Sequence, residues 1–320
     1  MPKRIFFCGE VVADLLEEKQ ESGEFKLFLG GSQFNGARGA KKAALREKVD
    51  LDVGFVGSLS KDLFGERFVS VLKEENIDIS GIKRVDRNTT LAIVSIRPNK
   101  ENEFSFYGRD TAEQMTKIED LPTSLGEIEE DKIFYFGSIS TVMEPARFAW
   151  LAFAAKQKET GLVMYDLNTR PSIAKDPKKY RELVLEWARI SHVMKASDAD
   201  IGWAYPDMNT EEVAKIWLEA GTTMVVLTKG TDGSEAYTKN MKAEVPTPAL
   251  VTTNTVGAGD NFNAGLAVFL HKNDCATPQK IAALNETQLA SILRGATHTA
   301  AHHLISIGAK LKEDNPIFAE

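Results

Sequence analysis

The chain has 320 residues, of which 43% are hydrophobic, and its formal net charge is −7 at pH 7. This length and composition support a packed core in one large α/β domain or in two domains. Lys and Arg are scattered among Asp and Glu, which argues against a basic surface for nucleic acid or an acidic membrane. The two cysteines, Cys8 and Cys275, argue against a disulfide framework or a thiolate metal site.

The N-terminal segment does not have the pattern of a secretory signal. Residues 1–4 lead directly into an apolar, strand-like run, without a long apolar stretch followed by a cleavage site of small residues. No apolar run in the sequence has the length needed to span a bilayer. We therefore expect a cytoplasmic protein.

Apolar runs that predict buried strands alternate with amphipathic segments that predict helices. The strand-like runs cover residues 5–8, 53–57, 133–137, 162–166, 192–195 and 224–228, and the helical segments include residues 63–75, 146–160, 180–189 and 210–220. This alternation predicts a doubly wound, mainly parallel α/β sheet with helices on both faces. Ligands bind at the carboxyl ends of the strands in such sheets, so residues at those ends are expected to share a site: Gly9, Gly137, Asp166, Lys195 and Thr228.

Two stretches break the alternation. Residues 25–29, 89–96 and 103–107 show the period of two that is typical of half-buried strands, and the polar residues 97–102 predict a turn between the last two runs. We expect these segments to form a small β unit beside the main sheet.

A glycine turn opens a helix near residue 257. The β-branched run Val251–Thr253 gives way to Gly257-Ala258-Gly259, and apolar residues then recur at helical spacing. The free amides of such a turn can face a phosphate. Asp260, in the first turn, is suited to accept a proton from a hydroxyl nucleophile, which favours phosphorylation of an alcohol. The alternative is an ordinary helix cap, because Asp is common at helix starts and short glycine motifs have many false matches.

A second glycine motif lies at residues 30–43, where Gly30-Gly31 and the polar Asn35 are followed by alanines along one face of a helix. Upstream, a buried strand ends at Gly9-Glu10, with Asp14 shortly after it. Together with Thr-Val-Gly-Ala-Gly-Asp at residues 255–260, these motifs resemble the signatures of the ribokinase/pfkB carbohydrate kinase family over nearly the whole chain. The resemblance implies a ribokinase-like fold and ATP-dependent phosphorylation of a sugar.

Intermediate segments resemble the bacterial fructokinase branch of that family, which favours fructose as the substrate and fructose 6-phosphate as the product. They are residues 107–113, 136–140, 166–171, 195–200 and 226–233. The Asp-x-Asn-x-Arg segment at residues 166–170 is also similar to 2-keto-3-deoxygluconate kinases, whose acid substrate Arg109 and Arg170 would suit. A more distant alternative is a regulator that binds a sugar or a nucleotide on the same scaffold without catalysis.

The resemblance assigns roles to individual residues. It implies that Asp260 is the general base and that the amides of Gly257, Ala258 and Gly259 stabilise the transferring phosphoryl group. For the sugar it implies Asp14, Gly31, Asn35, Tyr107, Arg109 and Arg170. By residue type alone, Asp14 is more often a surface carboxylate and Asn35 more often a helix cap, and Arg109 is nearly as often a surface ion-pair partner of Asp110 or Glu113 as a sugar ligand. The motif context favours sugar contact for Asp14 and Asn35.

For the nucleotide the resemblance implies Asn168, Lys195, Thr228, Gly230, Ala300, Ala301 and Gly308. Arg170 and Lys195 supply positive charge near the phosphates. Asp200 matches the acidic residue that acts on Mg²⁺ through water in this family. Asn254 replaces the family's usual Asp, which weakens the expectation of a monovalent cation site.

The small β unit corresponds to the lid that closes over the sugar in the family. We assign it residues 15–28 and 89–110, and assign residues 1–14, 29–88 and 111–320 to the α/β domain that binds substrate and nucleotide. Closure would exclude water, which competes with the sugar for ATP. The resemblance also implies a homodimer through the lid, whereas no nucleic-acid or membrane partner is expected.

Overall fold

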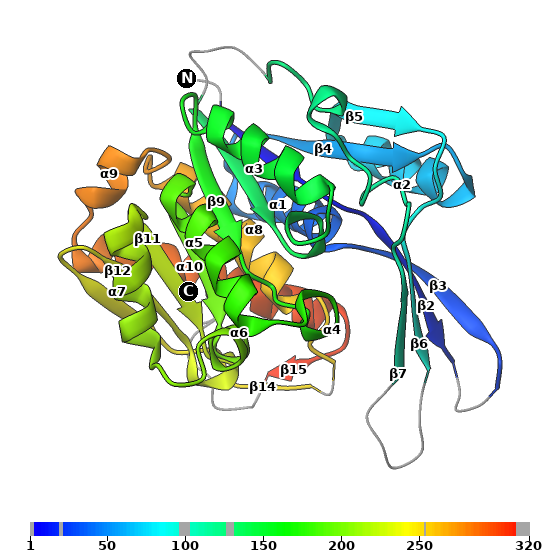
Figure 1. Cartoon of the computed structure of the whole chain (residues 1–320). Helices are drawn as coiled ribbons and strands as arrows, with labels where there is room; N and C mark the ends of the chain where they lie inside the picture. The colour runs from blue at the N-terminus through cyan, green and yellow to red at the C-terminus, as the bar shows by residue number, and fades with distance from the viewer. Residues whose placement is uncertain (1–2, 19–21, 96–102, 126–130, 253, 312–320) are drawn as a thin grey trace.

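A nine-stranded sheet forms the centre of the molecule in the computed structural model, which describes residues 3–18, 22–95, 103–125, 131–252 and 254–311 (Figure 1). The strand order is β13-β12-β11-β10-β9-β8-β1-β4-β5. Strands from β5 to β11 run parallel, whereas β12 and β13 pair antiparallel at one edge. The strands are β1 Lys3–Cys8, β4 Asp52–Ser60, β5 Asp78–Val85, β8 Asp131–Gly137, β9 Leu162–Asp166, β10 Val193–Ser197, β11 Met224–Thr228, β12 Ser234–Thr238 and β13 Lys242–Val245.

The side chains of each central strand alternate between two apolar cores. In β1, Ile5 and Phe7 belong to one core, whereas Phe6 and Cys8 belong to the other. Because successive residues of a strand point to opposite faces, a run of consecutive apolar residues requires helices on both faces.

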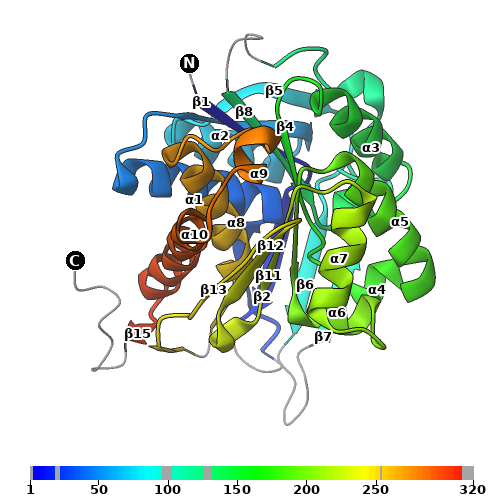
Figure 2. The same ribbon diagram turned by 90° about the vertical axis from the view of Figure 1, so that its left-hand side faces the viewer.

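Helices cover both faces of the sheet, as Figure 2 shows. The first core is closed by α1 Ser32–Glu47, α2 Leu63–Glu74, α8 Ala258–Lys272, α9 Pro278–Ala282 and α10 Glu286–Ser306. The second core is closed by α3 Ala146–Gln157, α4 Pro171–Ala174, α5 Pro177–Ile190, α6 Asp198–Ala204 and α7 Thr210–Ala220. Short 3₁₀ turns lie at η1 Ile118–Asp120, η2 Ile139–Thr141 and η3 Gly230–Asp232. The predicted doubly wound architecture is confirmed.

A separate four-stranded sheet projects from the body of the molecule (Figure 1). Its order is β3-β2-β6-β7, with β2 Val12–Glu17, β3 Phe25–Gly30, β6 Leu91–Ser95 and β7 Glu103–Tyr107. The sequence predicts Asp14 in the α/β domain and a small sheet that begins at residue 15. The small sheet instead begins at Val12, so Asp14 lies on its strand β2. The predicted turn at residues 97–102 lies outside the described residues. A short pair, β14 Leu250–Val251 and β15 Lys310–Leu311, joins the loop before α8 to the chain after α10.

The strand order reverses between β1 and β8. From β1 the chain builds outward to β4 and β5, and it then returns to place β8 on the opposite side of β1. A crevice forms at such a switch point, because the loops after the two strands leave toward opposite faces. Gly9 follows β1 and Gly137 is the last residue of β8, which places the expected site at this point of the sheet.

Helices α1 and α8 pack closely on the same face of the sheet. A Cβ atom on Gly39 of α1 would lie 2.5 Å from Asn261 Oδ1 and 3.2 Å from Ala264 Cβ, both on α8. Because Gly39 has no side chain, α1 and α8 can approach each other this closely.

We expect the substitution Gly39→Val to lower the free energy of unfolding by about 1–3 kcal/mol, because the added methyl groups have to push α8 away from α1. Gly202→Val is the matched control, since Gly202 lies in α6 and, outside its own helix backbone and chain neighbours, no atom of the described residues is within 4 Å of an added Cβ. Urea unfolding of both variants measures the difference. An equal loss in the two variants would show that helix propensity alone is responsible and that the interhelical contact is not tight.

Candidate active site

Asp260 is held by two side chains at the start of α8. Its Oδ1 accepts a hydrogen bond of 2.8 Å from Ser32 Oγ, and its Oδ2 accepts one of 2.9 Å from Asn35 Nδ2. Gly257 precedes the helix as its N-cap with φ 77°, a conformation that favours glycine. The turn therefore delivers a half-buried carboxylate with both oxygens oriented.

Ser32 and Asn35 reach Asp260 from the first turn of α1. Gly31 is the N-cap of this helix, and residues three apart lie on the same helical face. The sequence predicted Asn35 as a sugar ligand; here its amide also orients the predicted base.

The pKa of Asp260 is raised above the ordinary value of a carboxyl. Burial is the largest cause, whereas the hydrogen bonds from Asn35 and Ser32 and the charges of Arg170 and Lys195 lower the pKa. A carboxylate whose pKa is raised toward neutral pH is a stronger proton acceptor than one on the surface. The arrangement thus suits general-base chemistry.

Asp14 and Arg170 share the electrostatic environment of Asp260. Burial raises the pKa of Asp14 to about 6, the charge of Arg170 lowers it, and the charge of Asp260 raises it. Arg170 is exposed, and its guanidinium donates to Asn168 Oδ1 at 2.7 Å and to the carbonyl oxygens of Asn168 and Thr169 at 3.3 and 3.2 Å. The structure therefore brings two carboxylates and one guanidinium together at the end of the strands.

A buried ion pair lies on the other side of Asp260. Lys195 Nζ is 3.2 Å from Asp166 Oδ1 and 3.4 Å from Asp166 Oδ2, and both side chains are nearly inaccessible. Burial lowers the pKa of Lys195, but the charges of Asp166 and Asp200 outweigh it and the pKa is raised, so this lysine is an ammonium at neutral pH. A Cβ atom on Gly259 would lie 3.8 Å from Lys195 Nζ, which sets the ammonium beside the glycine turn.

Tyr135 and Asn263 connect Asp260 and its partner Ser32 to the Asp166–Lys195 ion pair. Asn263 Nδ2 donates to Asp166 Oδ2 at 2.7 Å and to Tyr135 Oη at 3.0 Å. The Tyr135 hydroxyl is 3.4 Å from Asp166 Oδ2 and 3.4 Å from Ser32 Oγ. A continuous polar chain thus runs from Asp260 through Ser32 and Tyr135 to Asp166.

Sequence reasoning did not assign roles to Ser32, Tyr135, Asp166 or Asn263. A signal for Asn263 was present, because it is a polar residue three positions after Asp260, on the same helical face and before an apolar run. Tyr135 gave a weaker signal, since aromatic residues are ordinary in strands.

Asp200 forms the capping box of α6 with the N-cap residue Ser197 and ties the helix to the loop after β9. Its Oδ2 accepts hydrogen bonds from Ser197 N at 2.8 Å and Ser197 Oγ at 2.7 Å, and its Oδ1 accepts one from Thr169 N at 2.7 Å. The carboxylate thus fixes the loop that carries Asn168 and Arg170. Within the described ranges, no group of three or more His, Cys, Asp or Glu residues is arranged to hold a metal ion.

The expected nucleotide residues follow neighbouring elements. Thr228 ends β11, where its Oγ1 donates to the carbonyl oxygen of Ala196 at 3.4 Å, and Gly230 begins η3. Ala300 and Ala301 lie on α10, and Gly308 follows that helix. His303 Nε2 is 2.9 Å from the carbonyl oxygen of Val256, so this end of α10 lies beside the glycine turn.

The amides of the glycine turn differ in their partners. The Ala258 amide donates to the carbonyl oxygen of Thr255 at 3.1 Å, while those of Gly257 and Gly259 have no backbone acceptor among the described residues. Asn254, at the position of the family's Asp, is exposed and its Oδ1 accepts from Val256 N at 3.0 Å.

Tyr107 and Arg109 lie apart from the other predicted sugar ligands. Tyr107 ends β7 with 58% of its surface exposed, and Arg109 is exposed as well. In the part of the chain that the structure describes, neither side chain is hydrogen-bonded to Asp14, Asn35 or Asp260. Both belong to the small sheet or its exit, so movement of that sheet would change their distance from the site.

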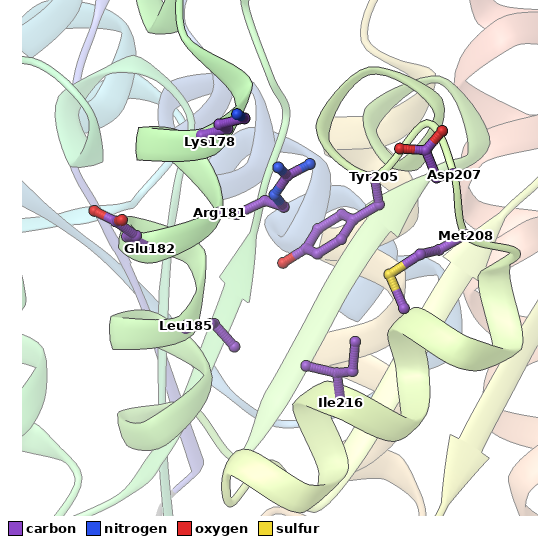
Figure 3. Close-up of a pocket in the computed structure, with 8 residues that line it drawn as sticks. All are labelled: Lys178, Arg181, Glu182, Leu185, Tyr205, Asp207, Met208 and Ile216. Carbon is purple, nitrogen blue, oxygen red and sulfur yellow. The ribbon is translucent and has the colours of Figure 1, made fainter.

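A pocket of about 570 Å³ lies between α5 and α7 (Figure 3). Arg181 and Tyr205 point into it, with Arg181 donating to the carbonyl oxygen of Ala204 at 2.8 Å. These helices cover the face of the sheet opposite α8. The pocket is therefore separate from Asp260.

Comparisons with known proteins identify relatives of this chain. The model of the pfkB family carbohydrate kinase matches residues 3–312. A fructokinase of Rhizobium leguminosarum bv. trifolii is 31% identical over 287 residues, which cover 89% of this chain and 85% of that protein. Fructokinase-2 of Zea mays is 31% identical over 275 residues, covering 83% of this chain and 79% of that protein.

Solved structures share the fold. The fructokinase of Vibrio cholerae O395 in its fructose, ADP and calcium ion bound form superposes with a TM-score of 0.79 at 23% identity, covering 94% of this chain and 92% of that chain. The aminoimidazole riboside kinase of Salmonella enterica, complexed with aminoimidazole riboside and an ATP analog, superposes with a TM-score of 0.79 at 22% identity. The match covers 94% of this chain and 93% of that chain. The predicted ribokinase-like fold is confirmed. Among the described residues, no helix combines the length and apolar character needed to cross a membrane.

Proposed function

This chain belongs to the pfkB family of carbohydrate kinases, and we propose that it transfers the γ-phosphoryl group of ATP to fructose, giving fructose 6-phosphate. The observation that carries the proposal is the Asp260 carboxylate, oriented by Ser32 and Asn35 at the glycine turn that opens α8. Fructose is favoured because relatives named fructokinase match most of the chain. We expect the reaction in the cytoplasm.

Asp260 acts as the general base. As the sugar oxygen forms its bond to the γ-phosphorus, the bond from that phosphorus to the β,γ-bridging oxygen breaks and the hydroxyl proton moves to the Asp260 carboxylate. ADP leaves with the bridging oxygen. The raised pKa of Asp260 favours this step, because it increases the affinity of the carboxylate for the proton.

The phosphate side is formed by the glycine turn and Lys195. The amides of Gly257 and Gly259 and the Lys195 ammonium stabilise the charge on the transferring oxygens, while the Ala258 amide joins them only if its bond to Thr255 opens. Mg²⁺ would be held by the ATP phosphates and water, with Asp200 acting on it through water, and it would neutralise phosphate charge. Thr228, Gly230, Asn168, Ala300, Ala301 and Gly308 would line the nucleotide.

The sugar side is formed by Asp14, Asn35 and the Gly31 backbone, with Arg170 at its edge. A second candidate substrate is 2-keto-3-deoxygluconate, because the exposed Arg170 guanidinium is available at this end of the site for a carboxylate. Arg109 would add a second cation on closure of the small sheet. Asp14 and Asp260 oppose that candidate, since their negative charges disfavour an acid substrate.

The substitution Asp260→Asn tests the base. We expect kcat to fall by about 100- to 10,000-fold with a small change in KM, because the amide keeps the shape of the carboxylate but cannot accept the proton. ADP release with ATP and Mg²⁺ is measured against fructose, 2-keto-3-deoxygluconate, ribose, tagatose, glucose and nucleosides. Asp86→Asn is the control, since Asp86 forms an exposed ion pair with Lys61.

The panel separates the candidates. Turnover of fructose that Asp260→Asn abolishes supports the proposal, whereas selective turnover of the acid sugar keeps the mechanism and replaces the substrate. Binding of a sugar without phosphorylation of any member would contradict a kinase and favour a binding protein.

The pKa of Asp14, raised to about 6 mainly by burial, predicts a pH dependence of sugar binding. Above pH 6 the carboxylate is ionised and accepts hydrogen bonds from sugar hydroxyls, and below pH 6 it is protonated. We therefore expect KM for the sugar to rise by up to about 10-fold for each pH unit below 6. Steady-state kinetics of Asp14→Asn should show a high KM that does not change over this range; a KM that still rises as in the parent enzyme would assign the titration to another group.

The small sheet, residues 15–28 and 89–110 together with the start of β2, is proposed to act as a lid and as a dimer interface. Phe25, Phe28 and Tyr107 on this sheet are 42%, 45% and 58% exposed, and a second copy of the chain would cover such side chains. We expect sedimentation velocity to give a dimer that Phe28→Glu converts to monomer. A monomer at every accessible protein concentration would contradict this interface.

A further inference from the structure

The Asp260 carboxylate is one end of a buried polar chain that the proposed reaction does not use directly. Ser32 Oγ donates to Asp260 Oδ1 at 2.8 Å, and the next member, the Tyr135 hydroxyl, is 3.4 Å from Ser32 Oγ. Asn263 Nδ2 donates to Tyr135 Oη at 3.0 Å and to Asp166 Oδ2 at 2.7 Å. Ser32, Tyr135 and Asn263 are 6%, 1% and 0% exposed, so little water competes for these groups.

The hydroxyl hydrogens of Ser32 and Tyr135 determine which group donates and which accepts at each step of the polar chain. A serine or tyrosine hydroxyl has one hydrogen to donate. The Ser32 hydrogen is used on Asp260, and the Tyr135 oxygen accepts from Asn263. The single hydroxyl hydrogen of Tyr135 therefore has two possible acceptors, each 3.4 Å from Tyr135 Oη. They are Ser32 Oγ on the sugar side and Asp166 Oδ2 on the phosphate side.

We propose that Ser32 and Tyr135 are positioning residues for phosphoryl transfer: Ser32 holds the Asp260 carboxylate ionised and aimed at the sugar hydroxyl, and Tyr135 fixes Ser32 relative to the Asp166–Lys195 pair. This inference rests on the proposed role of Asp260 as the base. The chain thereby keeps the proton acceptor on the sugar side at a constant distance from the ammonium on the phosphate side.

Ser32 acts on Asp260 through its hydrogen bond. Loss of a hydrogen bond that stabilises the charged form raises the pKa of a carboxyl, so the base is protonated at a higher pH. The other charged and titratable groups that face this region are Glu10 after β1, Asp14 from β2, Tyr135 from β8, Asp166 from β9, Arg170 before α4, Lys195 from β10 and Asp200 from α6. Ser32→Ala replaces none of these groups; it removes the hydrogen bond to Asp260 and the contact with the Tyr135 hydroxyl.

The test measures the single-turnover rate between pH 5 and 9 with sugar and ATP both saturating, so that titration of Asp14 in the free enzyme does not contribute. We expect Ser32→Ala to move the acid limb of the pH–rate profile to higher pH by about one unit, which lowers the rate at a given pH on that limb by about 10-fold. Tyr135→Phe should lower the rate by about 3- to 10-fold and move the acid limb less than Ser32→Ala does, because the hydrogen bond from Ser32 to Asp260 remains. Calorimetry should give Kd values for sugar and ATP within about 3-fold of the parent enzyme, since neither residue is proposed to bind them.

Two matched controls separate positioning from a loss of packing. Ser58→Ala removes a buried serine hydroxyl that has no hydrogen-bond partner among the described residues, and Tyr165→Phe removes a buried tyrosine hydroxyl that faces the opposite core. Both should keep the parent acid limb. Ser32→Thr, which restores a hydroxyl, should return the limb toward the parent value, and Ser32→Cys, a weak donor, gives the same test as Ser32→Ala if the alanine variant does not fold.

Each outcome decides the proposal. An acid limb in Ser32→Ala that matches the parent enzyme and Ser58→Ala would overturn the role of Ser32. A large loss of sugar affinity with an unchanged rate would also overturn it and make Ser32 a substrate ligand. If Asp260→Asn retains the parent rate, the proposed function itself fails, and this failure is distinct because it does not involve Ser32.

Discussion

The contact between α1 and α8 is the constraint on which the rest of the site depends. Ser32 and Asn35 are more than 200 positions from Asp260 in the sequence, yet both donate to its carboxylate. They do so because the two helices lie side by side on one face of the sheet and Gly39 allows their close approach. A wider separation would leave Asp260 buried with fewer donors, a costly state for a carboxylate.

Two sets of charged side chains lie beside the start of α8. In the first, the carboxylates of Asp14 and Asp260 lie near the positive charge of Arg170. In the second, Lys195 is buried against Asp166. Burying such a pair is unfavourable unless its remaining hydrogen-bonding atoms are satisfied, and Asn263 supplies one donor to Asp166. A fixed, partly dry arrangement of charges of this kind can stabilise a transition state without having to reorganise.

Under the proposed function, the small sheet would link binding of the sugar to these charges. Asp14 lies on β2, where it pairs with Phe28 of β3 and Ala92 of β6, so the carboxylate moves with the sheet. Closure would bring Asp14 closer to the sugar and also exclude water from around Asp260. Binding of the sugar and the electrostatic environment of the base would then change together.

The sequence by itself determined the layered α/β architecture, the small sheet and the glycine turn with Asp260, because hydrophobic periodicity and glycine placement are local properties of the chain. It also placed Asn35 at a helix start and Lys195 at a strand end, and the family resemblance grouped them with Asp14 and Arg170. The antiparallel β12–β13 edge and the position of Asp14 on the small sheet depended on strand pairing, which local patterns do not specify. Only the tertiary structure decided that Ser32, Tyr135, Asn263 and Asp166 form one chain with Asp260. Their hydrogen bonds join four elements that are distant in sequence, and a serine or tyrosine shows its partner only when packing brings that partner within reach.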